Sequence, residues 1–261
     1  MNKVFSSFDE AVADVPDGAV IMFSGFADPA AWPHHLIWAL RNQGAKNLTA
    51  ISSNMGIGPY LSRGPGAVGP GEIFAEISIL VENGQIRKGI STVFGSGRYK
   101  RTYGLSLPIE KAYLAGEVET ELVPLGTLEE RIRAGGAGIG GFYTPVGVGT
   151  IIAEGKETRL IDGREYILEF PLRADYAFIR AHKADKLGNL VYKGTSRCSG
   201  PTMATAADIT IAEVDEIIEP GELDPEVIVT PGIFVDRIVK ITEPGMYPKD
   251  RRSHETREGK L

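Results

Sequence analysis

The 261-residue sequence has little of the chemistry that builds metal or disulfide sites. It contains one cysteine, Cys198, and four histidines. A single cysteine excludes an intramolecular disulfide framework and a zinc site built from several thiolates. The histidines form neither an HExxH motif nor a pair four residues apart on a helix. We therefore expect no metal site. The histidines are His34, His35, His182 and His254.

Long apolar runs and an excess of positive charge are also missing. The longest apolar run, around residues 19–23, has the length of a strand and is too short to cross a bilayer. Asp9, Glu10 and Asp14 occupy the region where a signal peptide needs an apolar stretch. Lys plus Arg number 28 against 34 Asp plus Glu, which argues against a nucleic-acid or anionic-membrane partner. We expect a cytoplasmic protein.

The sequence is rich in glycine (32) and proline (16), yet 43% hydrophobic and 24% charged residues are values of a globular protein. An apolar strand at residues 19–23 precedes a helix between Pro33 and Gly44 and a second strand at residues 47–52. This strand–helix–strand order with short connections predicts a parallel sheet covered by helices, the α/β class. We expect a single domain over residues 1–242, followed by a polar tail at 243–261.

The remaining elements follow from periodicity and turn residues. Asp162-Gly163 is a strong hairpin signal and joins strands at residues 159–161 and 164–168. Other helices are expected after Ser7 and at residues 73–81, 108–115 and 127–133, and other strands at 86–94, 118–123, 174–181, 190–192, 208–214, 227–229 and 234–241.

Two glycine-rich segments, residues 53–71 and 135–149, are expected to be loops. Gly136, Gly138 and Gly141 match GxGxxG, but a helix precedes them and Pro145 follows, so a dinucleotide site is disfavoured. These glycines either shape turns or let backbone N–H groups approach a ligand.

Other possible site residues carry weaker signals. No base accompanies Cys198, which favours a small core or wall residue over a nucleophile. Ser24 lies just after a strand without the GxSxG elbow of a serine hydrolase. The basic run Arg98, Lys100 and Arg101 is typical of a solvated face, with a phosphate contact as the alternative.

Five segments together resemble a known family. They are residues 17–26 (DGAVIMFSGF), 126–149 (GTLEERIRAGGAGIGGFYTPVGVG), 154–163 (EGKETRLIDG), 181–189 (AHKADKLGN) and 221–234 (GELDPEVIVTPGIF). In order and spacing they are similar to the family I CoA-transferases, specifically the α (A-type) subunits of 3-oxoacid CoA-transferases. The likeness runs from about Phe5 to Ile241. It implies a three-layer, open and mostly parallel sheet with helices on both faces and an inserted β-hairpin.

The resemblance also implies a reaction and a partner. Coenzyme A moves between carboxylic acids by a ping-pong mechanism, through a glutamyl-CoA thioester. The family's nucleophilic glutamate lies in a Ser-Glu-Asn-Gly stretch of a homologous β subunit, in a heterodimer or an α2β2-type oligomer. Coenzyme A is then a substrate and no cofactor is tightly bound. Glu82-Asn83-Gly84 looks similar, but Val81 precedes it at the end of a helix, so we interpret it as a helix stop. No catalytic residue is expected in this chain.

The residues expected to line the substrate or CoA are those of the two best-matched turns, together with Leu125. An alternative is that both turns are structural or contact the partner. The expected lining residues are Ser24, Gly25, Phe26, Leu125, Gly138, Ile139, Gly140, Gly141 and Phe142.

Several departures from the family pattern leave the substrate open. Leu125 stands where a glutamine is common, Ser24 replaces a glycine, and residues 197–201 (RCSGP) replace Arg-Asn-Phe. The loop at residues 53–71 is also longer. Alternatives are therefore a CoA-thioester hydrolase or lyase on the same scaffold, or a non-catalytic acyl-CoA-binding homologue.

Overall fold

The computed structural model describes residues 2–26, 31–56, 75–95 and 106–242. Most of the segment 53–71, the start of the helix expected at 73–81 and the tail 243–261 lie outside the described residues, as do Arg98, Lys100, Arg101 and His254. No helix in the described ranges is long and apolar enough to span a membrane.

A mostly parallel, eight-stranded sheet organises the fold, in the order β11-β10-β8-β1-β2-β3-β4, with β9 pairing antiparallel to β8. Crossover helices between successive strands make the strands parallel, as the sequence predicts. The strands are β1 (Val20–Phe23), β2 (Leu48–Asn54), β3 (Ile86–Val93), β4 (Glu119–Leu122), β8 (Ala174–Asp185), β9 (Leu190–Val191), β10 (Ala207–Ile218) and β11 (Arg237–Lys240).

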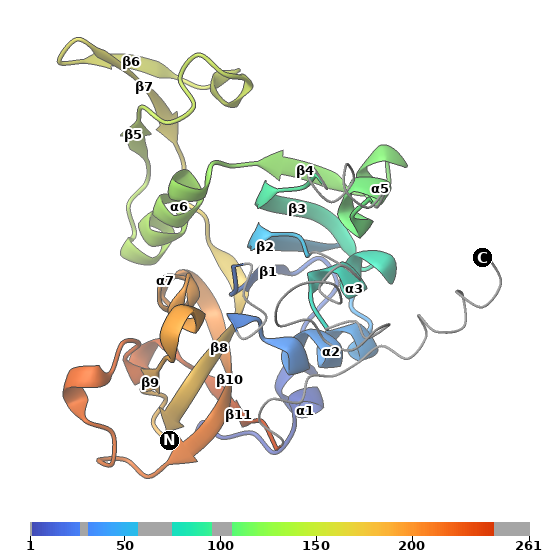
Figure 1. Ribbon diagram of the computed structural model, residues 1–261, viewed down its shortest axis with the longest axis vertical. Helices are drawn as coiled ribbons and strands as arrows, with labels where there is room; N and C mark the ends of the chain where they lie inside the picture. The colour runs from blue at the N-terminus through green and yellow to red at the C-terminus, as the bar shows by residue number, and fades with distance from the viewer. Residues whose placement is uncertain (1, 27–30, 57–74, 96–105, 243–261) are drawn as a thin grey trace.

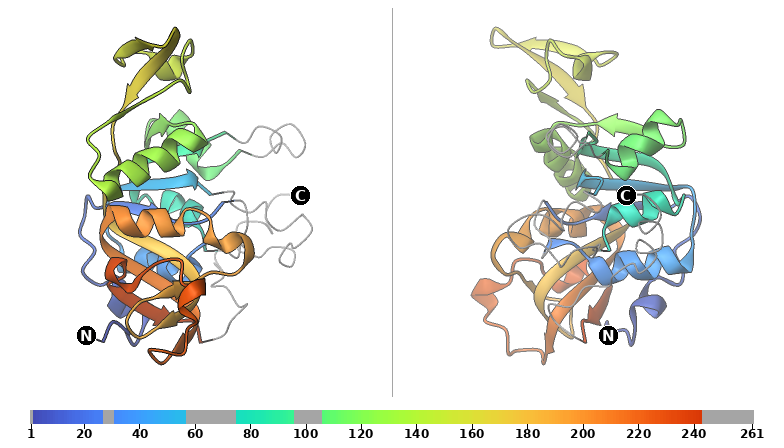
Figure 2. Two further views of the ribbon diagram at one scale, coloured as in Figure 1. Left: turned by 90° about the vertical axis from the view of Figure 1, so that its left-hand side faces the viewer. Right: turned by 45° about the vertical axis from the view of Figure 1, so that its right-hand side comes forward.

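Helices cover both faces of this sheet, as Figures 1 and 2 show. Successive strand residues point to opposite faces, so Phe23 and Phe178 enter one core, whereas Met22 and Ala177 enter the other. The first core packs under α1 (Phe8–Val12), α2 (His34–Gln43), α3 (Ile77–Glu82) and α5 (Pro108–Leu114); the second packs under α6 (Leu125–Ala137) and α7 (Gly200–Ala206). The α/β prediction is confirmed.

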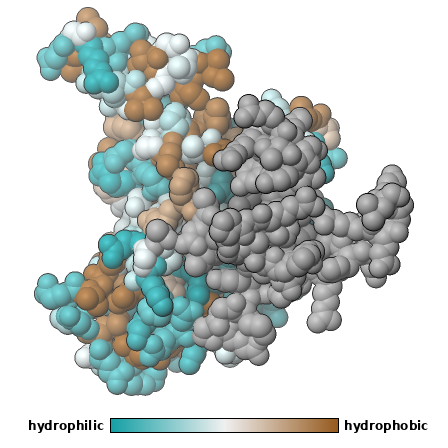
Figure 3. All heavy atoms as spheres, viewed as in Figure 1, coloured by the Kyte–Doolittle hydropathy of each residue, from teal (hydrophilic) through white to brown (hydrophobic). Residues whose placement is uncertain are grey.

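A small antiparallel sheet projects from one end of the main sheet (Figure 1). It consists of β5 (Phe142–Thr144), β7 (Arg164–Glu169) and β6 (Thr158–Ile161), in that order. The expected hairpin is present, with Asp162 and Gly163 both at positive φ. Apolar side chains lie on its surface (Figure 3), among them Leu160, which is 72% exposed.

Arg131 of α6 ties this small sheet to the body. Its Nη1 donates to Glu121 of β4 at 2.7 Å, and its Nε donates to the carbonyl of Phe170 at 2.8 Å. The carboxylate of Glu169, at the end of β7, lies 3.8 Å from Nε of Arg131 and pairs with Lys156 at 2.5 Å. A chain of ion pairs therefore crosses from the large sheet to the small one.

The C-terminal half differs from the predictions in three places. No strand forms at residues 227–229, because a 3-10 turn, η5 (Pro225–Val227), begins at a proline that lacks an N–H. A second turn, η6 (Gly232–Phe234), delays the last strand to Arg237. The helix α7 was not expected because Gly200-Pro201 resembles a turn, although proline is well tolerated in the first helical turn.

The second glycine-rich segment is only partly a loop. Gly135 and Gly136 belong to the last turn of α6. A Cβ atom on Gly135 would lie 1.9 Å from the carbonyl oxygen of Leu172, and one on Gly136 would lie 2.1 Å from Oγ1 of Thr205. Both glycines therefore permit close packing of α6, and this packing accounts for Gly136, the first glycine of the match to GxGxxG.

Candidate functional site

The carboxyl ends of β1 to β4 meet at one edge of the sheet, the carboxyl edge. Ser24 and Gly25 follow β1 directly, and Leu125 begins α6 just after β4. Ligands of open α/β sheets bind at this edge. Within the described residues, no group of histidine, cysteine and carboxylate side chains could hold a metal ion there or elsewhere.

Ser24 is fully buried and joins β1 to its neighbours. Its backbone N–H donates to the carbonyl of Phe178 at 3.0 Å. Its Oγ accepts the backbone N–H of Arg180 at 3.1 Å and donates to the carbonyl of Ala31 at 3.1 Å. The hydroxyl therefore replaces backbone pairing at the point where β1 stops and β8 continues.

Gly25 follows with a φ of +120°, and a Cβ atom there would lie 2.9 Å from the ring of Trp32. Only glycine fits this close approach without strain. The next residue, Phe26, is 45% exposed. The turn therefore places the Phe26 side chain at the surface, directly after two residues that are fixed at the carboxyl edge.

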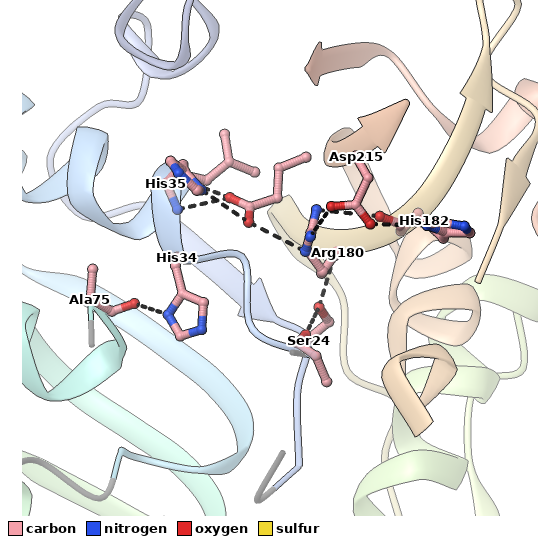
Figure 4. A network of polar contacts seen from close by, with 11 residues as sticks. Ser24, His34, His35, Ala75, Arg180, His182 and Asp215 are labelled. Carbon is pink, nitrogen blue, oxygen red and sulfur yellow. Dashed lines mark hydrogen bonds and ion pairs between the residues drawn. The ribbon is translucent and has the colours of Figure 1, made fainter. Parts of the chain in front are cut away.

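A polar network lies behind this turn (Figure 4). The Glu213 carboxylate on β10 is fully buried and accepts the backbone N–H groups of His35 at 2.8 Å and Leu36 at 3.1 Å. Pro33, at the N-cap of α2, offers no side-chain acceptor. Glu213 therefore caps α2 from a distant strand.

Arg180 balances the charge of this buried carboxylate. Its Nε lies 3.7 Å from Oε1 of Glu213, and its Nη2 donates to Asp215 at 2.5 Å. Nδ1 of His182 lies 3.0 Å from the other Asp215 oxygen. Burial favours a raised pKa for Asp215, but the hydrogen bonds from His182 and Arg180 outweigh it and hold the pKa below its ordinary value.

Sequence reasoning missed this network. The available signal was a charged residue inside each of two apolar strands, Arg180 in AFIRAH and Glu213 in TIAEVD. A charge at a buried strand position predicts an opposite charge on the neighbouring strand. Arg180 and Glu213 are indeed register partners in β8 and β10.

A second polar contact joins α6 to α7 on the other face. Glu129 lies one helical turn after Leu125, and the hydroxyl of Ser199 donates to its carboxylate. Cys198, beside Ser199, is exposed and has a φ of +30°. Burial raises the pKa of Glu129 above its ordinary value, more than the Ser199 hydrogen bond lowers it. Glu129 thus contacts one departure from the family pattern, at residues 197–201, and lies one helical turn from another, Leu125.

The expected lining residues do not all come together within this chain. Ser24, Gly25, Phe26 and Leu125 lie at the carboxyl edge. Gly138, Ile139, Gly140, Gly141 and Phe142 follow the far end of α6, a 13-residue helix about 20 Å long. Gly135, near that end, accepts a hydrogen bond from Arg173, just before β8 begins, so this end lies at the amino edge of the sheet.

Glu82 also lies away from the carboxyl edge. It is the last residue of α3, Asn83 is the C-cap, and Gly84 has a φ of +67°. Strand β3 begins at Ile86, so Glu82-Asn83-Gly84 lies at the amino edge of the sheet. The segment has the geometry of a helix stop.

Comparisons with known proteins agree with this architecture. Residues 5–241 match the family model described as Coenzyme A transferase. The chain is 46% identical over 242 residues to the A-type subunit of the 3-oxoadipate CoA-transferase of Pseudomonas putida, covering 93% of this chain and 95% of that protein. It is 41% identical over 240 residues to the A-type subunit of the succinyl-CoA:3-ketoacid coenzyme A transferase of Helicobacter pylori (strain J99 / ATCC 700824), covering 92% and 93%.

Among solved structures, the chain resembles the acyl-CoA transferase YdiF of Escherichia coli O157:H7 in a thioester complex with CoA. The TM-score is 0.78 at 22% identity, and the match covers 97% of this chain and 50% of that one. At 22% sequence identity, this structural similarity establishes the fold alone. Together with the family match and the relatives named as A-type subunits, it shows that the chain belongs to the coenzyme A transferase family and is the α (A-type) subunit of a CoA-transferase.

Proposed function

We propose that this chain is the half of a two-subunit CoA-transferase that lacks the nucleophile, and that its carboxyl edge completes the active site of a homologous β subunit. The observation that carries the proposal is the position of Glu82-Asn83-Gly84. This stretch, similar to the family's nucleophile motif, lies at the amino edge of the sheet, opposite the turn at Ser24, Gly25 and Phe26.

The proposed reaction proceeds in balanced steps. A glutamate carboxylate in the β subunit's active site attacks the thioester carbonyl of an acyl-CoA and expels the CoA thiolate, which leaves a mixed anhydride. The thiolate then attacks the glutamyl carbonyl, releases the first carboxylic acid as its anion, and forms glutamyl-CoA. A second carboxylate runs the same steps in reverse and leaves as the new acyl-CoA.

The contribution of this chain is positioning and the stabilisation of charge. Each attack places negative charge on a carbonyl oxygen, where fixed N–H donors contribute on the order of 3 kcal/mol. The turn at Ser24–Phe26, anchored by Arg180 and packed on Trp32, supports such a role, with Leu125 as a wall of the same site. Gly138, Ile139, Gly140, Gly141 and Phe142 lie at the opposite edge, where we propose that they contact CoA or the partner chain.

The relatives' names give the first substrates to test, 3-oxoadipate and the succinyl-CoA:3-ketoacid pair. We further propose that residues 1–242 act as one domain, in a heterodimer or an α2β2-type oligomer. A reducing cytoplasm keeps Cys198 as a thiol.

The experiment is to mix the chain, alone or with its β subunit, with acyl-CoA and then add hydroxylamine or borohydride. An adduct on a β-subunit glutamate, formed only with the β subunit present, is expected. An adduct on Glu82 of the isolated chain would overturn the proposal. Release of free CoA without an acceptor acid would instead identify a thioester hydrolase or lyase.

A further inference from the structure

We propose that one face of the small antiparallel sheet, the tyrosine face, is the surface on which the β subunit docks. The tyrosine face consists of Tyr143, Glu157, Arg159, Arg164, Tyr166 and Leu168. The inference rests on the proposed function, since it takes a homologous β subunit as the occupant. It adds the place of contact, which the fold and the relatives' names leave open.

The small sheet has almost no core of its own. Among residues 138–170, only Ile167 and Glu169 are buried. Large apolar side chains are exposed there (Figure 3), among them Ile151 and Leu160, each at 72%, and Phe170 at 61%. A small sheet is stable when it has a packed apolar face. The strands β5, β6 and β7 therefore require a cover that the described part of the chain does not provide.

One face of the small sheet is already covered by a turn of this chain. Ile167, in the middle strand, lies on this face. A Cβ atom on Gly147 would lie 2.8 Å from the side chain of Ile152 and 3.4 Å from that of Ile167. The turn at residues 147–152 therefore packs directly on Ile167 and leaves the opposite face as the one to be covered.

The opposite face is the tyrosine face. Successive residues of a strand point to opposite faces of the sheet, and directly paired residues share a face. The register pairs Tyr143 with Leu168 and Arg159 with Tyr166. Since Tyr166 and Leu168 flank Ile167 in β7, all four side chains point away from the turn that covers Ile167. Each of the four is at least partly exposed.

The chemistry of this face is that of a protein interface. The guanidinium of Arg159 lies 4.7 Å from the ring of Tyr143, and Glu157 accepts the Tyr143 hydroxyl and lies 3.5 Å from Arg159. The guanidinium of Arg164 lies 5.9 Å from the ring of Tyr166 and forms no ion pair within the described ranges. Tyrosine and arginine are enriched among the residues that supply most of the binding energy at interfaces. The face therefore fits a protein surface that places a carboxylate opposite Arg164.

Two observations favour the β subunit over a second copy of this chain. The relatives of this chain's length are named as subunits, whereas the region it matches in YdiF is 50% of that chain. In a symmetric contact between two copies, the same face meets itself. The one carboxylate of the tyrosine face, Glu157, already holds Tyr143 and Arg159, so a second copy offers Arg164 no free carboxylate on this face.

The tyrosine face is also fixed relative to the proposed active site. Helix α6 begins with Leu125 at the carboxyl edge, and β5 follows its far end after a short connection. Arg131 of α6 contacts both Glu121 of the large sheet and Glu169 of the small one. A subunit bound to the tyrosine face is therefore held at a defined distance from Leu125.

Hydroxyl-radical footprinting of the isolated chain and of its complex with the β subunit tests the contact. Tyr143 and Tyr166 should be oxidised in the isolated chain and should lose most of this reactivity in the complex, because a docked surface excludes solvent from both rings. Tyr113 on α5, which is 55% exposed, is the matched control and should react equally in both samples. This measurement uses the wild-type chain and needs no variant to fold.

Charge reversal on β7 measures the contribution to binding. Arg164→Glu should raise the Kd of the complex about tenfold or more, because the carboxylate expected opposite Arg164 then meets a like charge. Glu165→Lys is the matched control, since it reverses one charge at the next residue, whose side chain points to the opposite face. Its Kd should stay close to that of the wild type. Analytical ultracentrifugation measures both values, and thermal unfolding of the isolated variants checks folding.

Several results would overturn the inference alone. Protection of Tyr143 and Tyr166 in the isolated chain that disappears on dilution would assign the face to a second copy. Protection at every concentration would assign the cover to a segment of this chain outside the described residues. A complex that transfers CoA while both tyrosines stay reactive, or equal weakening by Arg164→Glu and Glu165→Lys, would remove the docking site from this face.

Failure of the proposed function looks different. Absence of any complex with the β subunit, or an adduct on Glu82 of the isolated chain, overturns the proposed function, and the inference with it.

Discussion

The carboxylate of Glu213 accepts the backbone N–H of His35 at 2.8 Å, although 178 residues separate them in the chain. This contact fixes the start of α2 to β10. Because α2 follows the turn at Ser24–Phe26, the same contact fixes the helix that supports this turn. Arg180 completes the arrangement, since its side chain faces Glu213 and its backbone N–H holds Ser24.

Replacing Glu213 should therefore strongly destabilise the fold. Glu213→Ala leaves Arg180 with a buried, partly unbalanced charge and α2 without its cap, and should lower the free energy of unfolding by about 3 kcal/mol or more. Glu213→Gln keeps one oxygen for the backbone N–H groups and should cost less. Urea unfolding measures both changes.

The control for this prediction is Glu216→Gln, on the same strand. Glu216 pairs with Lys183 at 2.7 Å, but the two side chains are 47% and 36% exposed. Its loss should cost far less than the loss of Glu213, because an exposed ion pair contributes little to stability. Equal effects of Glu213→Gln and Glu216→Gln would contradict the role given to the buried network.

A substitution at Gly135 tests whether close packing outweighs helix propensity. Alanine is favoured over glycine in a helix by about 1 kcal/mol. At Gly135, however, the added Cβ would meet the carbonyl of Leu172, a backbone atom that cannot rotate away. Gly135→Ala should therefore destabilise the protein by about 2 kcal/mol, whereas Gly126→Ala in the same helix, where nothing lies within 4 Å, should be neutral or stabilising. Thermal unfolding of the two variants decides between these effects.

Local patterns predicted the fold better than they predicted the site. The first two strands and the hairpin at Asp162-Gly163 were found because alternation and turn chemistry act over a few residues. Gly135 misled the prediction because a glycine that permits close packing looks the same in sequence as a glycine that turns the chain. The pairing of Glu213 with Arg180 joins two strands and the contact of Glu129 with Ser199 joins two helices, and no spacing along the chain encodes which residues will meet.

Asp215 should make the fold sensitive to acid. Although burial favours a raised pKa, hydrogen bonds from His182 and Arg180 hold the pKa of the folded state below 3.8. A carboxyl group whose pKa is lower in the folded state stabilises the protein at pH values above its pKa in the unfolded chain. This stabilisation is lost as the pH falls through the pKa of the folded state. Asp215→Asn should therefore reduce the free energy of unfolding at pH 7 and have a smaller effect near pH 3. Urea unfolding at each pH measures the free energy of unfolding of both proteins. An equal effect of the substitution at both pH values would contradict the lowered pKa of Asp215.

Glu129 should give the stability of the fold the opposite dependence on pH. Burial raises the pKa of its carboxyl group above 4.5 in the folded state, so between 4.5 and that higher value the folded protein binds more protons than the unfolded chain. Stability from this group is present below pH 4.5 and is lost as the pH rises through the folded value. Glu129→Gln removes this dependence, and its stability relative to the wild type should increase from pH 4 to pH 7. Glu130→Gln, which removes a charge that is already paired with Arg133, should show no such increase. Because unfolding reports on the carboxyl group without substrate, a flat difference for Glu129→Gln would show that the Ser199 hydrogen bond already offsets the burial of this charge.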